Sequence, residues 1–232
     1  MKFSKTRVVL FLAFAAIVAR CTNRDKVKNT VDFDRLYFDY AITAEEDAGY
    51  ATCVFQFKYG GEDGNAINIE PANVTLDGRK IETDSAKLSG FFYEVQKPID
   101  SFAGKHTIVF TTPNDKQYRN DFEFSPFTLE EELTGKISRK PFSIQLRNFP
   151  STEKSIRLLL LDTAFESSGF NDMISVTNGK VTIDESILRS VKKGPISLAL
   201  YMEQEIPLQE RTMAGGRIFI SYGLKRQFEL VD

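Results

Sequence analysis

Residues 51–65 read ATCVFQFKYGGEDGN, and this stretch decides the fold class. Ala51, Cys53, Phe55, Phe57 and Tyr59 alternate with a second set of side chains that includes threonine, glutamine and lysine. This period of two residues is typical of a β-strand with one buried face. The glycine-rich residues that follow predict a turn. Residues 51–65 are therefore predicted to form a strand followed by a turn, which we call the strand-and-turn unit.

The unit recurs along the whole chain. Strands are predicted at residues 36–42, 74–76, 91–95, 106–112 and 117–124, and again at 142–146, 156–161, 173–176, 181–183, 195–202 and 217–230. Residues 157–161 (RLLLL) lack alternation, which fits either a central strand buried on both sides or a short core helix. Residues 184–191 predict one helical turn. Short strands at this spacing favour a β-sandwich in each half.

The two halves end in the same way. FAGKHTIVF (102–110) precedes FEFSPF (122–127), and VKKGPISLAL (191–200) precedes GGRIFISYGLKRQFEL (215–230). In each pair a turn ending in glycine leads into a strand, and a further strand closes the half. This layout resembles the tandem immunoglobulin-like β-sandwich domains of uncharacterised envelope lipoproteins of the Bacteroidetes type. The resemblance implies an all-β fold, and the missing Cys…Trp…Cys pattern excludes antibody-type domains.

The predicted organisation has five parts. They are a signal peptide (1–20), a tether (21–30), an immunoglobulin-like domain (31–127), a linker (128–140) and a second immunoglobulin-like domain (141–232). The linker opens with TLEE (128–131), which fits a capping box for a short helix and equally a charged, solvated connection.

The N-terminus has the pattern of an export signal. Residues 1–20 contain four basic residues and no acid, and enclose an apolar run over 8–18 that is short for a membrane span of about 20 residues. VARC (18–21) resembles a bacterial lipobox, which implies acylation of Cys21 and cleavage before it. Arg20 stands where a lipobox has a small residue, so the alternative is cleavage near Ala19 and a secreted protein. Thr22 differs from the aspartate of inner-membrane retention, so we expect anchoring in the outer membrane, periplasmic or surface-facing.

Composition restricts the partners. Residues 1–20 hold four of the 30 basic residues and none of the 32 acidic ones, so the remainder has 26 basic and 32 acidic residues, a formal charge of −6. This balance argues against nucleic-acid binding, which uses a basic patch or stripe. Membrane contact is therefore expected through the lipid on Cys21. With Cys21 acylated, Cys53 is left alone, and no intramolecular disulfide is expected.

No residue pattern marks an enzyme. His106 is the only histidine and lies in phase with Ile108 and Phe110, which favours a partly buried strand residue over a catalytic base. Cys53 lies between Ala51 and Phe55 and is expected to be a packed thiol. A nucleophile signature is missing, and nothing marks a carboxylate pair of the glycosidase type. We expect no catalytic residue, no metal site and no cofactor.

Two ligand sites follow from weaker patterns. Glu62, Asp63 and Asn65 offer oxygen atoms that suit a cation such as Ca²⁺, although glycine-rich acidic loops usually serve as turns. Sugar binding uses aromatic platforms, and the chain has no tryptophan. The tyrosines that could replace tryptophan are Tyr93, Tyr118, Tyr201 and Tyr222.

We therefore expect a non-catalytic lipoprotein that binds or scaffolds another envelope protein. Pairing at a strand edge is a natural binding mode for such folds, and Arg217, Phe219 and Tyr222 mark a candidate partner strand. The alternative for this strand is pairing within its own domain. The alternative function is a glycan-binding accessory subunit of a surface polysaccharide-uptake system, which an exposed row of tyrosines would favour.

Overall fold

A computed structural model of the protein describes residues 31–232 apart from 87–89, 134 and 164–166. The predicted signal peptide, the tether and Cys21 lie outside the described residues. We call residues 32–127 the N-terminal half and residues 128–232 the C-terminal half. Within the described ranges, no helix has the length and apolarity required to cross a membrane.

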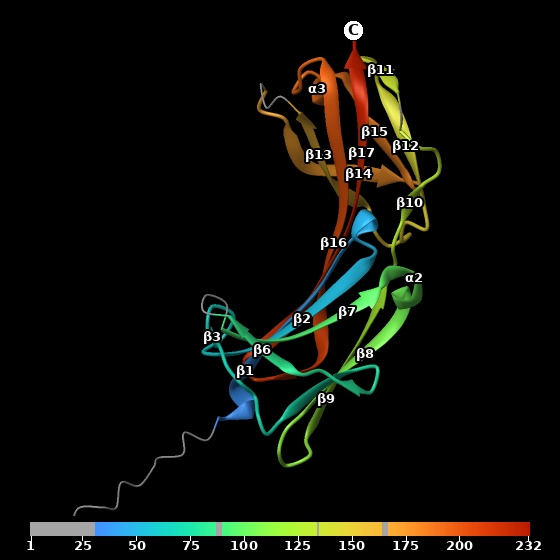
Figure 1. Ribbon diagram of the computed structural model, residues 1–232. Coiled ribbons are helices and arrows are strands. Elements are labelled where there is room, and N and C mark those ends of the chain that lie inside the picture. Colours follow the sequence, from blue (N-terminus) through green and yellow to red (C-terminus); the bar gives the residue numbers. More distant parts are fainter. Residues whose placement is uncertain (1–30, 87–89, 134, 164–166) are drawn as a thin grey trace, which may run out of the picture. The chain divides into compact units, whose positions relative to one another are not determined.

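The N-terminal half is a sandwich of two sheets (Figure 1). Its elements are η2 (Phe33–Arg35), β1 (Leu36–Glu45), η3 (Glu46–Ala48), β2 (Tyr50–Tyr59), β3 (Asn65–Ala66), β4 (Asn73–Leu76), β5 (Arg79–Lys80), β6 (Thr83–Ala86), β7 (Gly90–Pro98), α2 (Ile99–Phe102), β8 (Gly104–Thr111) and β9 (Gln117–Phe124). The strand order is β1-β2-β7-β6 in one sheet and β5-β4-β8-β9 in the other. Read in chain order, this is the ABED and CFG arrangement of an immunoglobulin sandwich, with β5 added beside β4.

Aromatic side chains fill the space between these two sheets. The Phe38 ring on β1 lies 5.0 Å from Phe110 on β8 and 5.4 Å from Tyr118 on β9, measured between ring centroids. Phe57 on β2 lies 4.8 Å from Phe110. These rings come from alternate strand positions, which explains why the period of two over residues 51–59 was a reliable sign of a buried sheet face.

The C-terminal half has the same plan. Its elements are β10 (Thr128–Leu129), β11 (Lys136–Ser138), β12 (Phe142–Arg147), β13 (Ser155–Asp162), β14 (Phe170–Thr177), β15 (Lys180–Ile183), α3 (Glu185–Leu188), β16 (Gly194–Thr212) and β17 (Gly215–Val231). β10, β12 and β15 pair on one side, and β13, β16 and β17 pair on the other, with β14 joining β13 to β15. The predicted all-β, immunoglobulin-like fold is confirmed by this strand order.

The turn that ends in glycine contains a short helix in both halves. α2 leads to Gly104 at φ +122°, and α3 is followed by Gly194 at φ +123°, and each glycine begins a strand. A positive φ at this position favours glycine, because the Cβ of any other residue makes this backbone conformation sterically unfavourable. Asp184 caps α3 by accepting a hydrogen bond from the Ile187 N–H at 3.0 Å, so the predicted helical turn is confirmed.

Two local predictions need correction. TLEE (128–131) forms no helix: Thr128 and Leu129 make strand β10, because they pair with Arg147 and Leu146 of β12. RLLLL (157–161) lies in strand β13, and only one of its faces is fully buried. Leu158 faces the core, whereas Leu159 and Leu161 lie half-buried on the outer face. The division into two domains with a linker at 128–140 stays a prediction, and β10 and β11 lie in that segment.

A long hairpin connects the two halves. β16 has 19 residues and β17 has 17, and Figure 1 shows both strands running through the C-terminal half into the N-terminal half. β17 pairs with β16 on one side, and residues 216–223 pair in parallel with β1 on the other. One continuous sheet therefore passes from the C-terminal half into the N-terminal half.

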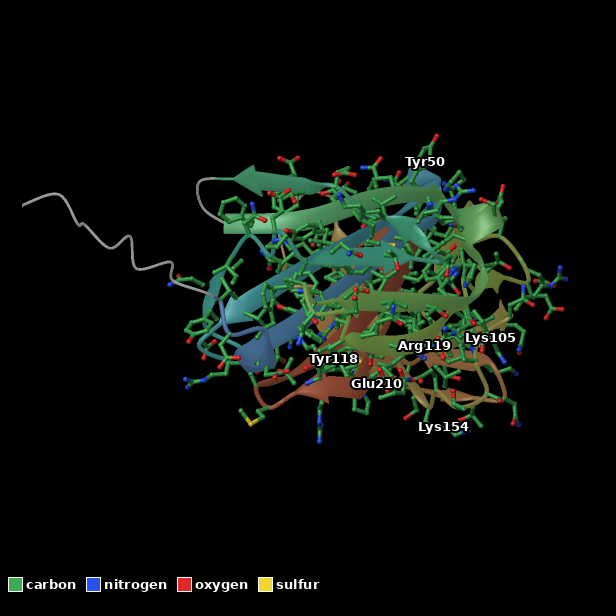
Figure 2. The ribbon with its side chains drawn as sticks, turned by 90° about the horizontal axis from the view of Figure 1, so that it is seen from below. Tyr50, Lys105, Tyr118, Arg119, Lys154 and Glu210 are labelled. Carbon is green, nitrogen blue, oxygen red and sulfur yellow. The ribbon has the colours of Figure 1, made fainter. Side chains whose placement is uncertain are left out.

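The tip of the hairpin also contacts the second sheet of the N-terminal half. The β16–β17 ladder is irregular after Pro207, which has no N–H to donate. Residues 209 and 210 turn instead to β9, where Glu210 Oε2 accepts the Arg119 N–H at 2.6 Å and Gln209 Oε1 accepts the Asp121 N–H at 2.8 Å. Figure 2 shows Glu210 beside Arg119. The hairpin therefore closes the N-terminal sandwich along both of its sheets.

Charged and aromatic contacts fix the junction of the halves. The Arg226 guanidinium on β17, which is 15% exposed, binds Glu46 of η3 at 2.6 Å and Glu132 of the connecting segment at 3.0 Å. The hydrogen bond to Glu46 has the largest effect on the pKa of Arg226. Together with the bond to Glu132, it outweighs the effect of burial and raises this pKa. At the same junction, the Tyr222 ring packs edge-on against Phe127, with 5.3 Å between the ring centroids. An apolar, ion-paired junction of this kind restricts relative motion of the two halves.

Candidate functional site

The predicted partner strand is not a free edge. Arg217 lies between Asp39 of β1 and Pro207 of β16, Phe219 lies between Ala41 and Glu205, and Tyr222 lies between Ala44 and Met202. Both sides of the strand are thus occupied at all three residues. The reason is the length of the hairpin, which carries this segment out of its own half and against β1. The alternative, pairing within its own domain, is confirmed on the side of β16, and β1 of the N-terminal half occupies the other side.

Arg217 instead organises a charged cluster on the outer face of the continuous sheet. Its Nε donates to Asp39 Oδ1 at 3.1 Å, and its Nη1 lies 3.0 Å from Glu62 and 3.4 Å from Glu205. Lys58 Nζ donates to the other oxygen of Asp39 at 2.6 Å. Burial raises the pKa of Asp39, but the bonds from Lys58 and Arg217 outweigh burial and leave its pKa below the ordinary 3.8.

The structure brings together two sets of residues that were predicted separately. Glu62, a candidate cation ligand, is ion-paired with Arg217, a candidate partner-strand residue. Asp63 is exposed in the loop, and Asn65 belongs to β3 and pairs with Tyr59. Among the described residues, no group of three or more His, Cys, Asp or Glu side chains is placed to hold a metal ion. Cation binding at Glu62, Asp63 and Asn65 stays a prediction.

His106 and Cys53 have structural surroundings. His106 Nδ1 lies 2.8 Å from Asp77 Oδ2, its Nε2 lies 2.6 Å from the Phe102 carbonyl oxygen, and its ring stacks on Phe102. The imidazole thus fastens the turn before β5 to the end of α2. Cys53 is fully buried, and burial raises the pKa of its thiol to about 12. A buried, protonated thiol is a poor nucleophile.

The four candidate sugar-platform tyrosines do not form an exposed row. Tyr93, Tyr118 and Tyr222 are each less than 5% exposed. The Tyr93 hydroxyl accepts a hydrogen bond from the Ile69 N–H at 3.1 Å, so this hydroxyl stabilises the fold. The half-buried ring of Tyr201 lies over Gly223, where a Cβ would collide with it. The alternating aromatic residues therefore pack in the core and against the sheet, and these four tyrosines form no exposed sugar platform.

An open strand edge lies elsewhere, at the beginning of β14. Residues 170–175 of β14 pair with β13 on one side, and within the described part of the chain only residues 176 and 177 pair on the other side, with β15. The Met173 N–H points away from β13, since it donates to the carboxylate of Asp172 at 2.7 Å. The Val176 N–H points toward β13 and donates to the Lys154 carbonyl oxygen at 2.8 Å. Because donors alternate along a strand, Asn171 and Ser175 share the outward direction of Met173.

A groove of about 660 Å³ runs beside this edge. β14 contributes Met173 and Ser175, β15 contributes Lys180 and Thr182, and β12 contributes Gln145. The Met173 side chain is 41% exposed, and it lies next to hydroxyl, amide and ammonium groups. The arrangement combines a row of outward backbone groups with an apolar anchor and polar side chains. These features suit an extended peptide, which offers alternating donors, acceptors and side chains.

The sequence pattern did not indicate this edge. It predicted a strand at 173–176, whereas β14 begins at Phe170. Phe170, Asn171, Asp172 and Met173 lack alternation because three of them are exposed. Such loss of the period of two at the start of a strand is the signal that could have indicated an edge.

Comparisons with known proteins add little to this geometry. No family model and no curated protein sequence matches the chain. Among solved structures, the chain is similar to the tandem Ig repeats of Dlar (8% identity, 81% of this chain and 97% of that chain, TM-score 0.24). It is also similar to SGBP-B of the Bacteroides ovatus mixed-linkage glucan utilization locus in complex with a mixed-linkage heptasaccharide (12%, 83% and 44%, 0.24) and to the Yersinia pseudotuberculosis adhesin InvE (8%, 84% and 61%, 0.23). TM-scores this low carry no argument, and the fold assignment rests on the strand order above.

Proposed function

We propose that this chain is an exported envelope lipoprotein, anchored through Cys21, that binds another envelope protein without catalysis. The signal-peptide pattern and the lipobox-like VARC (18–21) support export and anchoring. The structural surroundings of His106 and Cys53 support a role other than catalysis. The resemblance to envelope lipoproteins of the Bacteroidetes type supports the same compartment.

The open edge of β14 is the observation that carries the binding role. In the described part of the chain, its outward N–H at Met173 donates to the neighbouring carboxylate of Asp172, and a partner strand would replace that carboxylate as the acceptor. A partner strand would bond to the backbone at Asn171, Met173 and Ser175 and place side chains in the adjacent groove. Main-chain bonds supply affinity in this mode, and the side-chain positions supply specificity.

The backbone bond at Met173 gives a direct test. Met173→Pro removes the outward N–H and leaves the bonds between β13 and β14 in place, because proline is tolerated at strand edges. Met173→Thr is the matched control, since it changes the same side chain and keeps the N–H. Each variant of residues 22–232 is immobilised and exposed to detergent-solubilised envelope extract, and mass spectrometry identifies the retained proteins.

We expect a specific protein to be retained by the natural sequence and by Met173→Thr, and its retention to fall at least about tenfold with Met173→Pro. Equal retention by both variants would overturn strand addition at β14. Retention of polysaccharide that free sugar competes away, without a protein, would favour the glycan-binding alternative. The burial of Tyr93, Tyr118 and Tyr222 supports the protein partner over the glycan.

A further inference from the structure

The tip of the β16–β17 hairpin exposes an apolar side chain beside the first described residues. Met213 is 85% exposed, the highest value among the large apolar residues that the structure describes. Its N–H donates to the Asp34 carbonyl oxygen at 3.2 Å, and the neighbouring Thr212 hydroxyl donates to the Leu36 carbonyl oxygen at 2.5 Å. The tip is thus fastened to residues 34–36, and the exposure of Met213 does not arise from a loose turn.

Further groups surround Met213. Tyr59 at the end of β2 is 44% exposed and, with Arg35, lines a pocket of about 370 Å³ whose wall includes Met213 and Ala214. We call Arg35, Tyr59 and Met213 the tip surface. It joins a flexible apolar chain, an aromatic ring with a polar hydroxyl, and a guanidinium. Tyrosine and arginine suit the boundary between water and lipid because each has an apolar body and a polar end.

Two acidic residues near the tip surface, Asp34 and Glu62, are already paired. Asp34 accepts hydrogen bonds from Lys116 Nζ at 2.6 Å and from the Tyr118 hydroxyl. The bond from Lys116, followed by that from Tyr118, holds the pKa of Asp34 below its ordinary value. Glu62 is paired with Arg217 at 3.0 Å. These pairings reduce the repulsion that free carboxylates would meet at an anionic membrane.

The covalent chain places the tip surface within reach of the predicted anchor. Asp32 follows Cys21 by eleven residues, and an extended chain of that length spans at most about 40 Å. The Met213 N–H donates a hydrogen bond to the carbonyl oxygen of Asp34, which lies two residues after Asp32. Between the anchor and Asp32 the sequence has Arg24, Lys26 and Lys28 against one acid, Asp25.

We propose that the tip surface docks on the lipid bilayer that holds the acyl chains of Cys21. This inference rests on the lipid anchor of the proposed function. Met213 and Tyr59 enter the boundary between headgroups and acyl chains, and Arg35 meets lipid phosphates. A lipid anchor combined with a second membrane contact binds more firmly than either alone. Docking would hold the N-terminal half at the membrane and fix the orientation of the whole described unit.

Tryptophan fluorescence tests this orientation, because the chain has no tryptophan of its own. Met213→Trp and Tyr59→Trp each place a single reporter on the tip surface. Tyr50→Trp is the matched control, since Tyr50 is 53% exposed and lies at the opposite end of the same strand, nine residues or about 30 Å from Tyr59. The full acylated chain is reconstituted in phosphatidylcholine–phosphatidylglycerol vesicles with and without brominated acyl chains. Thermal unfolding confirms that each variant is folded.

We expect vesicle flotation of all three variants, at least about twofold quenching of the reporters at 213 and 59 by brominated lipid, and little quenching at 50. Flotation with equally weak quenching at all three positions would overturn the docking and leave the anchor intact. The variant Cys21→Ala, which cannot be acylated at this position, is the control for the anchor. If the full chain floated no better than Cys21→Ala, both the lipid anchor and the docking would be overturned.

Discussion

Asn120 and Glu210 exchange two hydrogen bonds although they are 90 residues apart in the sequence. The Asn120 Nδ2 donates to the Glu210 carbonyl oxygen at 2.9 Å, and the Glu210 N–H donates to Asn120 Oδ1 at 3.1 Å. The side-chain amide thus does for the hairpin tip what a peptide group does in a neighbouring strand. Asn120 is fully buried on β9, so the hairpin reaches into the N-terminal sandwich through this residue.

Replacing Asn120 by alanine should therefore loosen the hairpin tip. We expect the free energy of unfolding to fall by about 1–3 kcal/mol, because two backbone groups of Glu210 lose their partners. Urea unfolding at equilibrium measures the change. Gln209→Ala is the control: it removes exposed bonds to the Asp121 backbone and should cost less than about 1 kcal/mol. Equal losses in the two variants would contradict the role given to Asn120.

Two buried tyrosines should respond to phenylalanine in opposite ways. Among the described residues, the Tyr40 hydroxyl is the buried side-chain oxygen or nitrogen that has no hydrogen-bond partner. Tyr40→Phe should leave stability unchanged or raise it by about 1 kcal/mol, because an unsatisfied polar group leaves the core. Tyr93→Phe should lower stability by about 1–2 kcal/mol, because the Ile69 N–H loses its acceptor. Differential scanning calorimetry compares them, and destabilisation by Tyr40→Phe as large as by Tyr93→Phe would refute the assignment.

The Arg217 cluster should make stability sensitive to acid. Lys58 and Arg217 overcome the effect of burial and lower the pKa of Asp39 in the folded chain. A lowered pKa contributes stability that is complete above the ordinary value of 3.8 and is lost as the pH falls through the folded value. Asp39→Asn should therefore cost about 1–2 kcal/mol near neutral pH and progressively less below pH 3.8.

Urea unfolding near neutrality and at about pH 3 tests this dependence. Asp63→Asn serves as the control, because Asp63 is exposed in the neighbouring loop, and its effect should be small at every pH. A loss with Asp39→Asn that stays constant down to about pH 3 would show that geometry rather than charge is responsible.

Cys53 should be unreactive in the folded chain. Its thiol is fully buried on β2 with a pKa of about 12, so the thiolate fraction near pH 8 is about one in ten thousand. We expect residues 22–232, in which Cys53 is the only cysteine, to react with a disulfide reagent only after denaturation. Stoichiometric labelling of the native chain within minutes would show that β2 opens readily.

Local alternation was enough to predict the strands, and long-range pairing was not. The period of two at Phe55 and Phe57 correctly indicated a sheet face, and the glycines at 104 and 194 correctly marked the two crossing turns. No local pattern shows that β17 extends beyond its own half and pairs with β1. The sequence of a strand indicates which of its faces is buried, but it does not indicate which strand pairs beside it. The open edge of β14 could not be predicted for the same reason. It exists because, among the described residues, β15 pairs with β14 only at residues 176 and 177.

The site residues also differ in whether local sequence was enough to predict their surroundings. Burial of Cys53 and His106 was predicted from their phase in a strand. Arg217 was chosen for an edge that the fold covers, and its contact with Glu62 could not be foreseen because 155 positions separate the two residues. Met213 was not singled out, since a methionine at a hairpin tip becomes notable only when its exposure and its bond to Asp34 are known.

The pairing of β1 with β17 has a consequence for biogenesis. If the chain is exported from its N-terminus as proposed above, β1 emerges well before residues 216–223, so one side of β1 stays unpaired until those residues follow. Contacts this distant in sequence slow folding and leave the incomplete sheet exposed to aggregation. Under that proposal, a holding factor that shields residues 38–45 would protect the unpaired side of β1 during export, and a chain truncated before residue 215 would need that protection permanently.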